Sequence, residues 1–117
     1  MTEQTGAYLR AQREKLRETD PAFSLRQVAE RVGLEPSYLS KIERGIEQPS
    51  EATLVALAKE LEIDVDVLLA MAGKVSSRLQ AIICSKPKVF GELLEALENE
   101  PDHAILRIVR EVRDGKW

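Results

Sequence analysis

Four residues of one short predicted helix could meet a partner molecule, and three of them carry side chains that can hydrogen-bond to it. They fall at the outward, N-terminal end of the segment 36–44: Pro36, Ser37, Tyr38 and Lys41. A hydroxyl, a phenol and an ammonium group placed there can reach the base edges in a DNA major groove. The alternative is structural, with the Tyr38 ring packed on the preceding helix and Lys41 as a solvated surface charge.

The residues around this segment meet the steric needs of a helix-turn-helix. Ala29 is small enough to let a second helix pack across the first, and Gly33 can adopt the left-handed conformation of the turn. Leu39 and Ile42 can anchor the second helix to a core. These four residues would hold the segment 36–44 so that its N-terminal end projects outward.

Helical spacing of apolar residues recurs along the chain, and the sequence predicts an all-α protein. The predicted helices lie near 5–18, 24–32, 36–44, 50–61, 64–72 and 75–84, followed by one with an apolar stripe over 90–97 and one that starts at Pro101. Their expected N-terminal caps are Ser24 (with Gln27 completing a capping box), Glu35, Ser50 and Asp64. Gly33, Gly45 and Gly73 are expected to end helices.

The same spacing predicts which way individual side chains face. Tyr8 should share the apolar face of the first helix, and Val67 and Met71 should point inward from the fifth. Cys84, in an apolar run, should be a buried small residue, since no flanking base marks a reactive thiol. Arg31 should be a solvated surface charge.

The helices group into two predicted domains. Residues 1–73 should form a compact five-helix domain, and residues 74–117 a C-terminal extension of about three further helices. The apolar stripes of the extension exceed what a small domain needs, which favours dimerisation or docking of a protein partner. Completion of the monomer core is the alternative.

Composition argues against several classes of function. The chain has one cysteine and one histidine, Cys84 and His103, so it cannot form an intramolecular disulfide or a Cys/His zinc cluster. No nucleophile motif, glycine-rich phosphate loop or paired-carboxylate motif is present, so we expect neither an enzyme nor a cofactor. No apolar run is long enough to span a membrane and no secretory signal is visible, so a cytoplasmic protein is expected.

The charge of the chain is unevenly distributed. The net charge is -3, which by itself disfavours a polyanionic partner. Residues 1–45, however, carry eight Lys or Arg against seven Asp or Glu, whereas residues 46–72 carry six acids against Lys59 alone. The near-neutral, arginine-rich end could face DNA while the acidic segment faces away. One subunit should bind modestly, so dimerisation is expected.

The stretch from Ser24 to Gly45 closely resembles the lambda-repressor and Cro class of helix-turn-helix regulators, the XRE family. The most specific part is Tyr38-Leu39-Ser40-Lys41-Ile42-Glu43-Arg44-Gly45, followed by Pro49-Ser50. The resemblance covers roughly residues 5–72. It implies a lambda-repressor-like DNA-binding domain that reads the major groove with the helix 36–44.

The resemblance also implies roles for single residues. Pro36, Ser37, Tyr38 and Lys41 would meet bases, and Glu43 would pair with Arg13 to orient the recognition helix. This chain has Leu25 where the family often has a phosphate-binding Gln, so Arg26 or Gln27 would take over that contact. The connection 17–23 is longer than usual. The full set of implied phosphate contacts is Arg26, Gln27, Ser40, Arg44, Gln48 and Ser50.

Two functional hypotheses follow. The first is a sequence-specific transcriptional regulator of the repressor class, which binds double-stranded DNA as a homodimer at a palindromic operator. The second is a protein-interaction module, such as the antitoxin of a toxin–antitoxin or mobile-element system, with DNA binding secondary and a protein partner on the C-terminal helices. Gene neighbourhood separates the two, and selection of bound sequences from a random DNA pool tests the first, since failure to enrich any site would exclude it.

Overall fold

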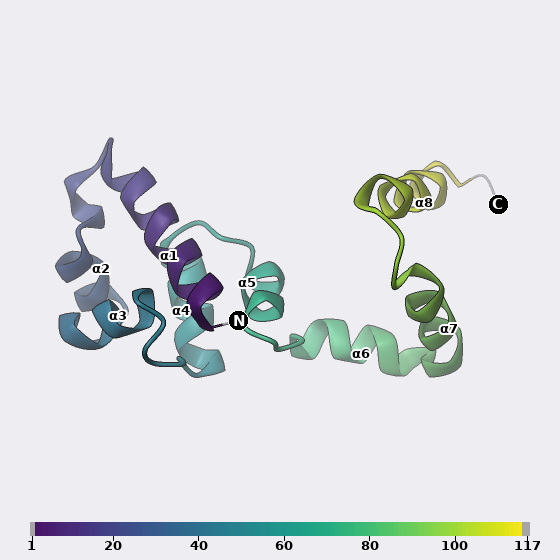
Figure 1. Cartoon of the computed structure of the whole chain (residues 1–117), viewed down its shortest axis with the longest axis horizontal. Helices are drawn as coiled ribbons and strands as arrows, with labels where there is room; N and C mark the ends of the chain where they lie inside the picture. The colour runs from purple at the N-terminus through teal and green to yellow at the C-terminus, as the bar shows by residue number, and fades with distance from the viewer. Residues whose placement is uncertain (1, 116–117) are drawn as a thin grey trace. The chain divides into compact units, whose positions relative to one another are not determined.

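The computed structural model describes residues 2–115, and these form an all-helical fold (Figure 1). The predicted fold class is therefore confirmed. The helices are α1 (Thr2–Arg17), α2 (Leu25–Arg31), α3 (Pro36–Glu43), α4 (Glu51–Glu60), α5 (Val65–Met71), α6 (Ser77–Ser85), α7 (Pro87–Leu97) and α8 (Asp102–Asp114). A short 3₁₀ turn, η1 (Pro21–Phe23), lies between α1 and α2. None of these helices is long and apolar enough to cross a bilayer.

The chain divides into two compact units, with the boundary between Leu79 and Gln80. This boundary falls inside α6. It lies a little beyond Gly73, the last residue of the first domain predicted from the sequence. The first unit holds α1 to α5, and the second holds α7 and α8.

The core of the first unit collects apolar side chains from all five of its helices. In this unit α1 packs against α3 and α5, α2 against α3, and α4 against α5. Residues three and four apart share one face of a helix, so each helix contributes a short stripe to the common core. The fully buried large side chains are Leu9, Val28, Leu39, Ile42, Leu54, Leu57, Leu61, Leu68 and Leu69.

Side-chain caps begin three of the helices where the sequence predicts them. The hydroxyl oxygens of Ser24 and Ser50 accept hydrogen bonds from the backbone N–H groups of Gln27 (3.3 Å) and Thr53 (3.2 Å). The Asp64 carboxylate accepts one from Val67 at 3.1 Å. The predicted capping by Glu35 is wrong: Glu35 occupies the cap position of α3, but its side chain makes no capping hydrogen bond. Glutamate is a poor cap residue, and Pro36 has no N–H that needs a partner.

The turns between helices use the left-handed backbone region. Gly33 has φ +74° and no heavy atom near the place of a side chain, as expected for the turn between α2 and α3. Glu62 has φ +58° shortly after α4, although it is not a glycine, and no residue type in this segment predicts it. The connection 17–23 is ordered by Asp20, whose carboxylate accepts a hydrogen bond from Ala22 N at 2.9 Å.

Three predictions of burial were wrong. Val67 is 49% exposed because the neighbouring Leu68 and Leu69 take the core face of the seven-residue helix α5. Tyr8 is 40% exposed, since Leu9 is the buried residue of that turn of α1. Cys84 is exposed in α6, which buries no side chain. Met71 is half-buried.

The last helical segment of the first unit is fixed to α5 by polar contacts. Arg78 donates from Nη2 to the Asp66 carboxylate at 3.0 Å, and the Ser76 hydroxyl accepts from Leu79 N at 3.2 Å. Hydrogen bonds from Ser76 and Arg78 lower the pKa of Asp66. These contacts hold the start of α6 in place at the end of the first unit.

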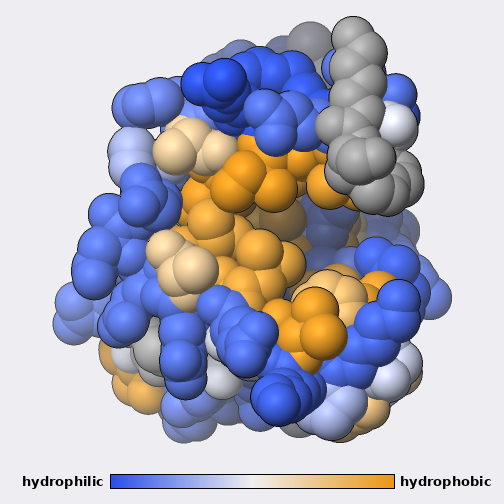
Figure 2. All heavy atoms as spheres, turned by 90° about the vertical axis from the view of Figure 1, so that its right-hand side faces the viewer, coloured by the Kyte–Doolittle hydropathy of each residue, from blue (hydrophilic) through white to orange (hydrophobic). Residues whose placement is uncertain are grey.

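The second unit differs from the first in its burial. Every described residue from Gln80 to Gly115 is exposed or half-buried, so the apolar side chains of α7 and α8 have no closed core around them. Figure 2 shows one face of the molecule, on which hydrophobic side chains gather in a patch with hydrophilic ones around it.

Candidate nucleic-acid interface

The helix α3 presents its polar residues to solvent because its apolar residues are fixed in the core. Leu39 and Ile42 are each 1% exposed. The opposite side of the helix is then open, and Pro36, Ser37 and Lys41 are exposed on it. Ser37, in the first turn of α3, and Lys41, in its last turn, are four residues apart and therefore share one face.

Tyr38 and Ser40 are less accessible than these residues. Tyr38 is half-buried and packs against the core of the first unit. This packing agrees with the structural alternative to DNA contact that the sequence allows for the Tyr38 ring. Ser40 is half-buried, and its carbonyl oxygen accepts a hydrogen bond from Arg44 Nε at 3.4 Å. The exposed polar face of α3 thus consists of Ser37 and Lys41, with Arg44 beyond its last residue.

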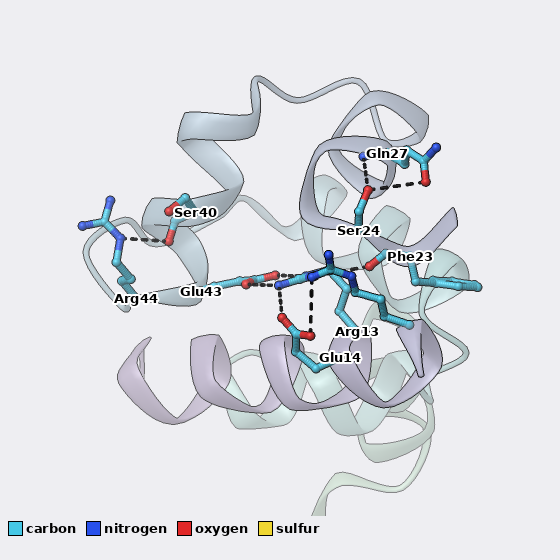
Figure 3. Close-up of polar contacts among 9 residues, drawn as sticks. Arg13, Glu14, Phe23, Ser24, Gln27, Ser40, Glu43 and Arg44 are labelled. Carbon is cyan, nitrogen blue, oxygen red and sulfur yellow. Dashed lines mark hydrogen bonds and ion pairs between the residues drawn. The ribbon is translucent and has the colours of Figure 1, made fainter. Parts of the chain in front are cut away.

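A buried ion pair ties α3 to α1 (Figure 3). Arg13 meets the Glu43 carboxylate with two nitrogens, Nε to Oε2 at 2.7 Å and Nη2 to Oε1 at 3.0 Å. Both side chains are only 4% exposed. The remaining guanidinium nitrogen, Nη1, donates to the carbonyl oxygen of Phe23 at 3.2 Å, and Nη2 also meets Glu14 at 3.1 Å. One arginine therefore joins α1, α3 and η1.

The charge state of this arginine is secured by its partner. The hydrogen bond with Glu43 raises the pKa of Arg13, against the opposing effect of burial. A two-point guanidinium–carboxylate contact also fixes the direction of both side chains. The pair sets the angle at which α3 lies on α1, and with it the direction in which Ser37 and Lys41 project.

The residues implied to contact phosphate lie at the two ends of the helix-turn-helix. Arg26 and Gln27 are exposed in the first turn of α2. The Ser24 hydroxyl accepts from Gln27 N and donates to Gln27 Oε1 at 3.4 Å (Figure 3). The amide oxygen of Gln27 is thereby occupied, while its NH₂ group can donate outward.

The loop after α3 carries the remaining implied contacts. Gln48 and Ser50 are exposed, and Pro49 between them is buried, which anchors the loop. The Ser50 hydroxyl caps α4 by accepting from Thr53 N and donates to the Thr53 hydroxyl at 3.0 Å. Arg26 and Gln27 lie on α2, which packs on α3, whereas Gln48 and Ser50 follow α3 in this separate loop.

Arg31 is the residue whose expected role the structure changes. It forms an ion pair with Glu60 of α4, and its guanidinium lies 5.2 Å from the centroid of the Phe23 ring. The expectation of a freely solvated charge is wrong, because the fold brings a carboxylate and an aromatic face to it from distant parts of the sequence. Arg31 therefore joins α2 to α4 and is no longer a free cation beside α3.

Gly6 is a positioning residue that the sequence reading missed. It lies in α1 where that helix crosses the C-terminal end of α3. A Cβ atom at this position would lie 2.8 Å from the carbonyl oxygen of Glu43 and closer still to that of Ile42. A glycine inside a helical pattern is a known sign of such close approach. This sign could have identified Gly6.

Comparison with known proteins places these features in a wider context. A family model described as helix-turn-helix matches residues 9–68. An uncharacterized HTH-type transcriptional regulator of Mycobacterium tuberculosis, Rv0474, is 41% identical over 68 residues, which are 58% of this chain and 45% of that protein. The transcriptional regulator ClgR of the same organism is 33% identical over 64 residues, 55% of this chain and 57% of ClgR. The chain thus spans about half the length of these relatives, and no solved structure matches it significantly.

Proposed function

This chain belongs to the XRE-type helix-turn-helix family of DNA-binding transcriptional regulators, and from this premise we propose that it is a sequence-specific regulator that binds an operator as a homodimer. The observation that carries the proposal is the exposed pair Ser37 and Lys41 on a helix whose orientation is fixed by the buried contact of Arg13 with Glu43. An interface that reads bases needs side chains held in a fixed position, and the contact between Arg13 and Glu43 supplies that rigidity.

In the proposed complex α3 enters the major groove with its N-terminal end. Ser37 and Lys41 meet base edges, and Pro36 and Tyr38 contribute apolar contact beside them. Arg44 and Ser40 at the far end of α3 and Arg26 and Gln27 at the start of α2 contact the phosphate backbone. Gln48 and Ser50 extend these contacts beyond α3. Phosphate contacts fix the register, and base contacts select the sequence.

The homodimer follows from the charges. The first 45 residues are close to neutral, so one domain neutralises few phosphates and binds weakly. Two copies on one face of the duplex, about 34 Å apart, double these contacts and match a palindromic operator. We assign DNA binding to the domain 1–73 and the joining of the two copies to the extension 74–117. We expect the protein to act in the cytoplasm.

Selection from a random DNA pool tests the proposed function. The full chain should enrich one sequence with twofold symmetry, because two recognition helices related by a dimer axis read two equivalent half-sites. A Lys59→Ala variant serves as the matched control: Lys59 is an exposed lysine of α4, outside the residues assigned to DNA contacts, and its loss should leave the enriched sequence unchanged. If the wild-type chain enriches no sequence, the proposed function is wrong.

Lys41→Ala and Arg44→Ala should weaken binding in different ways. Loss of a base contact at Lys41 should cost about 1–3 kcal/mol on the selected site and relax the preference at one base pair. Loss of a phosphate contact at Arg44 should weaken all sequences alike and reduce the salt dependence of log K by about 1. Titration of both variants on the selected site and on single-base variants, over a range of salt concentration, measures this. Identical, sequence-independent losses would remove Lys41 from the base-reading set.

A further inference from the structure

Arg10 lies on the side of α1 that meets the recognition helix. It follows Gly6 by four residues and precedes Arg13 by three, and residues three or four apart share one face of a helix. Gly6 lies directly against the carbonyl oxygens of Ile42 and Glu43. Arg13 pairs with the Glu43 carboxylate. Arg10 stands between these two contacts and is therefore placed beside the C-terminal end of α3.

The charge of Arg10 is not neutralised within the described chain. Arg10 is exposed, and none of the described carboxylates forms an ion pair with it. The carboxylates of Glu14 and Glu43, which lie on this side of α1 and at the end of α3, contact Arg13 instead, at 3.1 Å and 2.7 Å (Figure 3). Glu3, seven residues before Arg10, is about 10 Å away along the helix axis. The guanidinium group of Arg10 is therefore available to an anion from outside the chain.

A second guanidinium group lies at the same end of α3. Arg44 directly follows the last residue of α3, is exposed, and donates from Nε to the carbonyl oxygen of Ser40 at 3.4 Å. Among residues 2–115, no carboxylate forms an ion pair with Arg44. Two like charges held at one end of a helix without a counter-ion attract an anion, and the planar guanidinium group matches the geometry of phosphate. The chemistry of this place therefore points to a phosphate group as the partner.

The face of α1 that carries Arg10 runs between two places where the proposed complex contacts the DNA backbone. One is the C-terminal end of α3, against which Gly6 lies. The other is the start of α2: Nη1 of Arg13 donates to the carbonyl oxygen of Phe23, and Phe23 directly precedes the cap residue of α2. With α3 in the major groove, phosphates are therefore expected along this face of α1.

We propose that Arg10 contacts a DNA phosphate from α1, beside the phosphate bound by Arg44. The inference rests on the proposed function, because it uses the docking of α3, and it adds a contact from a helix outside the helix-turn-helix. It supplies one more neutralised phosphate per subunit in a domain whose first 45 residues are close to neutral. Arg10 then helps to position the protein on the duplex and carries no base preference, since phosphates are the same at every base pair.

Salt titrations of Arg10→Ala and Lys15→Ala test this contact in the full chain. Lys15 is an exposed cation of the same helix, and it follows Gly6 by nine residues. This separation is about two and a half turns, so Lys15 projects from the side of α1 opposite to α3. On the selected site, the slope of log K against log salt concentration should become shallower by about 0.9 per bound subunit for Arg10→Ala. The slope for Lys15→Ala should match wild type. An unchanged slope for Arg10→Ala, or an equal change for Lys15→Ala, would overturn the proposal.

A structural role for Arg10 predicts a different result. A cation beside the C-terminal end of a helix stabilises that helix through its dipole. If this were the function of Arg10, Arg10→Ala would lower the midpoint of thermal unfolding and leave the salt dependence of DNA binding as in wild type. The phosphate contact predicts the reverse, with an unchanged midpoint by circular dichroism and a shallower slope. Arg10→Lys keeps the positive charge and should keep a slope close to that of wild type.

The same titration on a duplex of unrelated sequence separates this contact from the proposed function. If wild type binds both duplexes alike and Arg10→Ala still makes the slope shallower, the proposed function fails and the contact stands. If wild type selects a sequence and Arg10→Ala has the wild-type slope, the contact fails and the proposed function stands. Where both hold, Arg10→Ala should weaken binding to every duplex by the same factor and leave the selected sequence unchanged.

Discussion

Arg13→Met should lower the free energy of unfolding by about 3–5 kcal/mol, because it removes one partner of a buried ion pair and leaves the other without compensation. The side chain of Glu43 is 4% exposed, and both of its carboxylate oxygens accept hydrogen bonds from Arg13. The change also deprives the Phe23 carbonyl oxygen of its donor. Urea denaturation followed by circular dichroism measures the loss.

Two further variants separate this effect from the loss of an arginine in general. Arg107→Met breaks an exposed pair on α8, where the arginine is 76% exposed at its side chain, and should leave stability almost unchanged. The double variant Arg13→Met with Glu43→Leu replaces both charges by apolar groups and should recover most of the loss. If Arg13→Met proves as mild as Arg107→Met, the pair does not hold α3, and the rigidity on which the proposed function rests is absent.

The double variant also separates stability from recognition. With both charges removed, the core can close around apolar side chains, but α3 loses the two-point contact that fixes its angle on α1. The double variant should then unfold nearly as wild type does and still bind the selected DNA site less tightly. Such a result would show that the ion pair serves orientation more than stability.

Features that depend on a few neighbouring residues could be predicted from the sequence. The caps at Ser24, Ser50 and Asp64 each need one side chain and an N–H three residues on, and the structure contains all three. The left-handed turn at Gly33 is similarly local. The apolar spacing correctly located every α-helix to within a few residues.

Features that depend on distant partners could not be predicted in the same way. Arg31 meets Glu60 and Phe23 only because the fold brings three segments together. Apolar spacing shows which face of a helix is apolar and gives no information on what covers it, which is why Cys84 and Val67 were wrongly expected to be buried. The left-handed conformation of Glu62 has no residue-type signal, since glycine or asparagine would be expected there.

Gly6→Ala should destabilise the first unit by about 3 kcal/mol, the upper part of the range for a forced contact in a packed interior. The new Cβ would meet the carbonyl oxygens of Ile42 and Glu43, and both are backbone atoms that cannot rotate away. The higher helix propensity of alanine offsets only about 1 kcal/mol of this cost. α1 must then move off the end of α3, so affinity for the selected DNA site should fall as well.

The control for this substitution is Gly91→Ala, made in the same type of secondary structure. Gly91 lies inside α7 with no heavy atom within 4 Å of the place of a Cβ, so alanine there brings only its helix propensity. Thermal unfolding by circular dichroism should therefore show a large decrease in midpoint for Gly6→Ala and none for Gly91→Ala. An unchanged midpoint for Gly6→Ala would mean that α1 and α3 lie further apart than described. The close approach of α1 to the recognition helix would then no longer account for the orientation of Ser37 and Lys41.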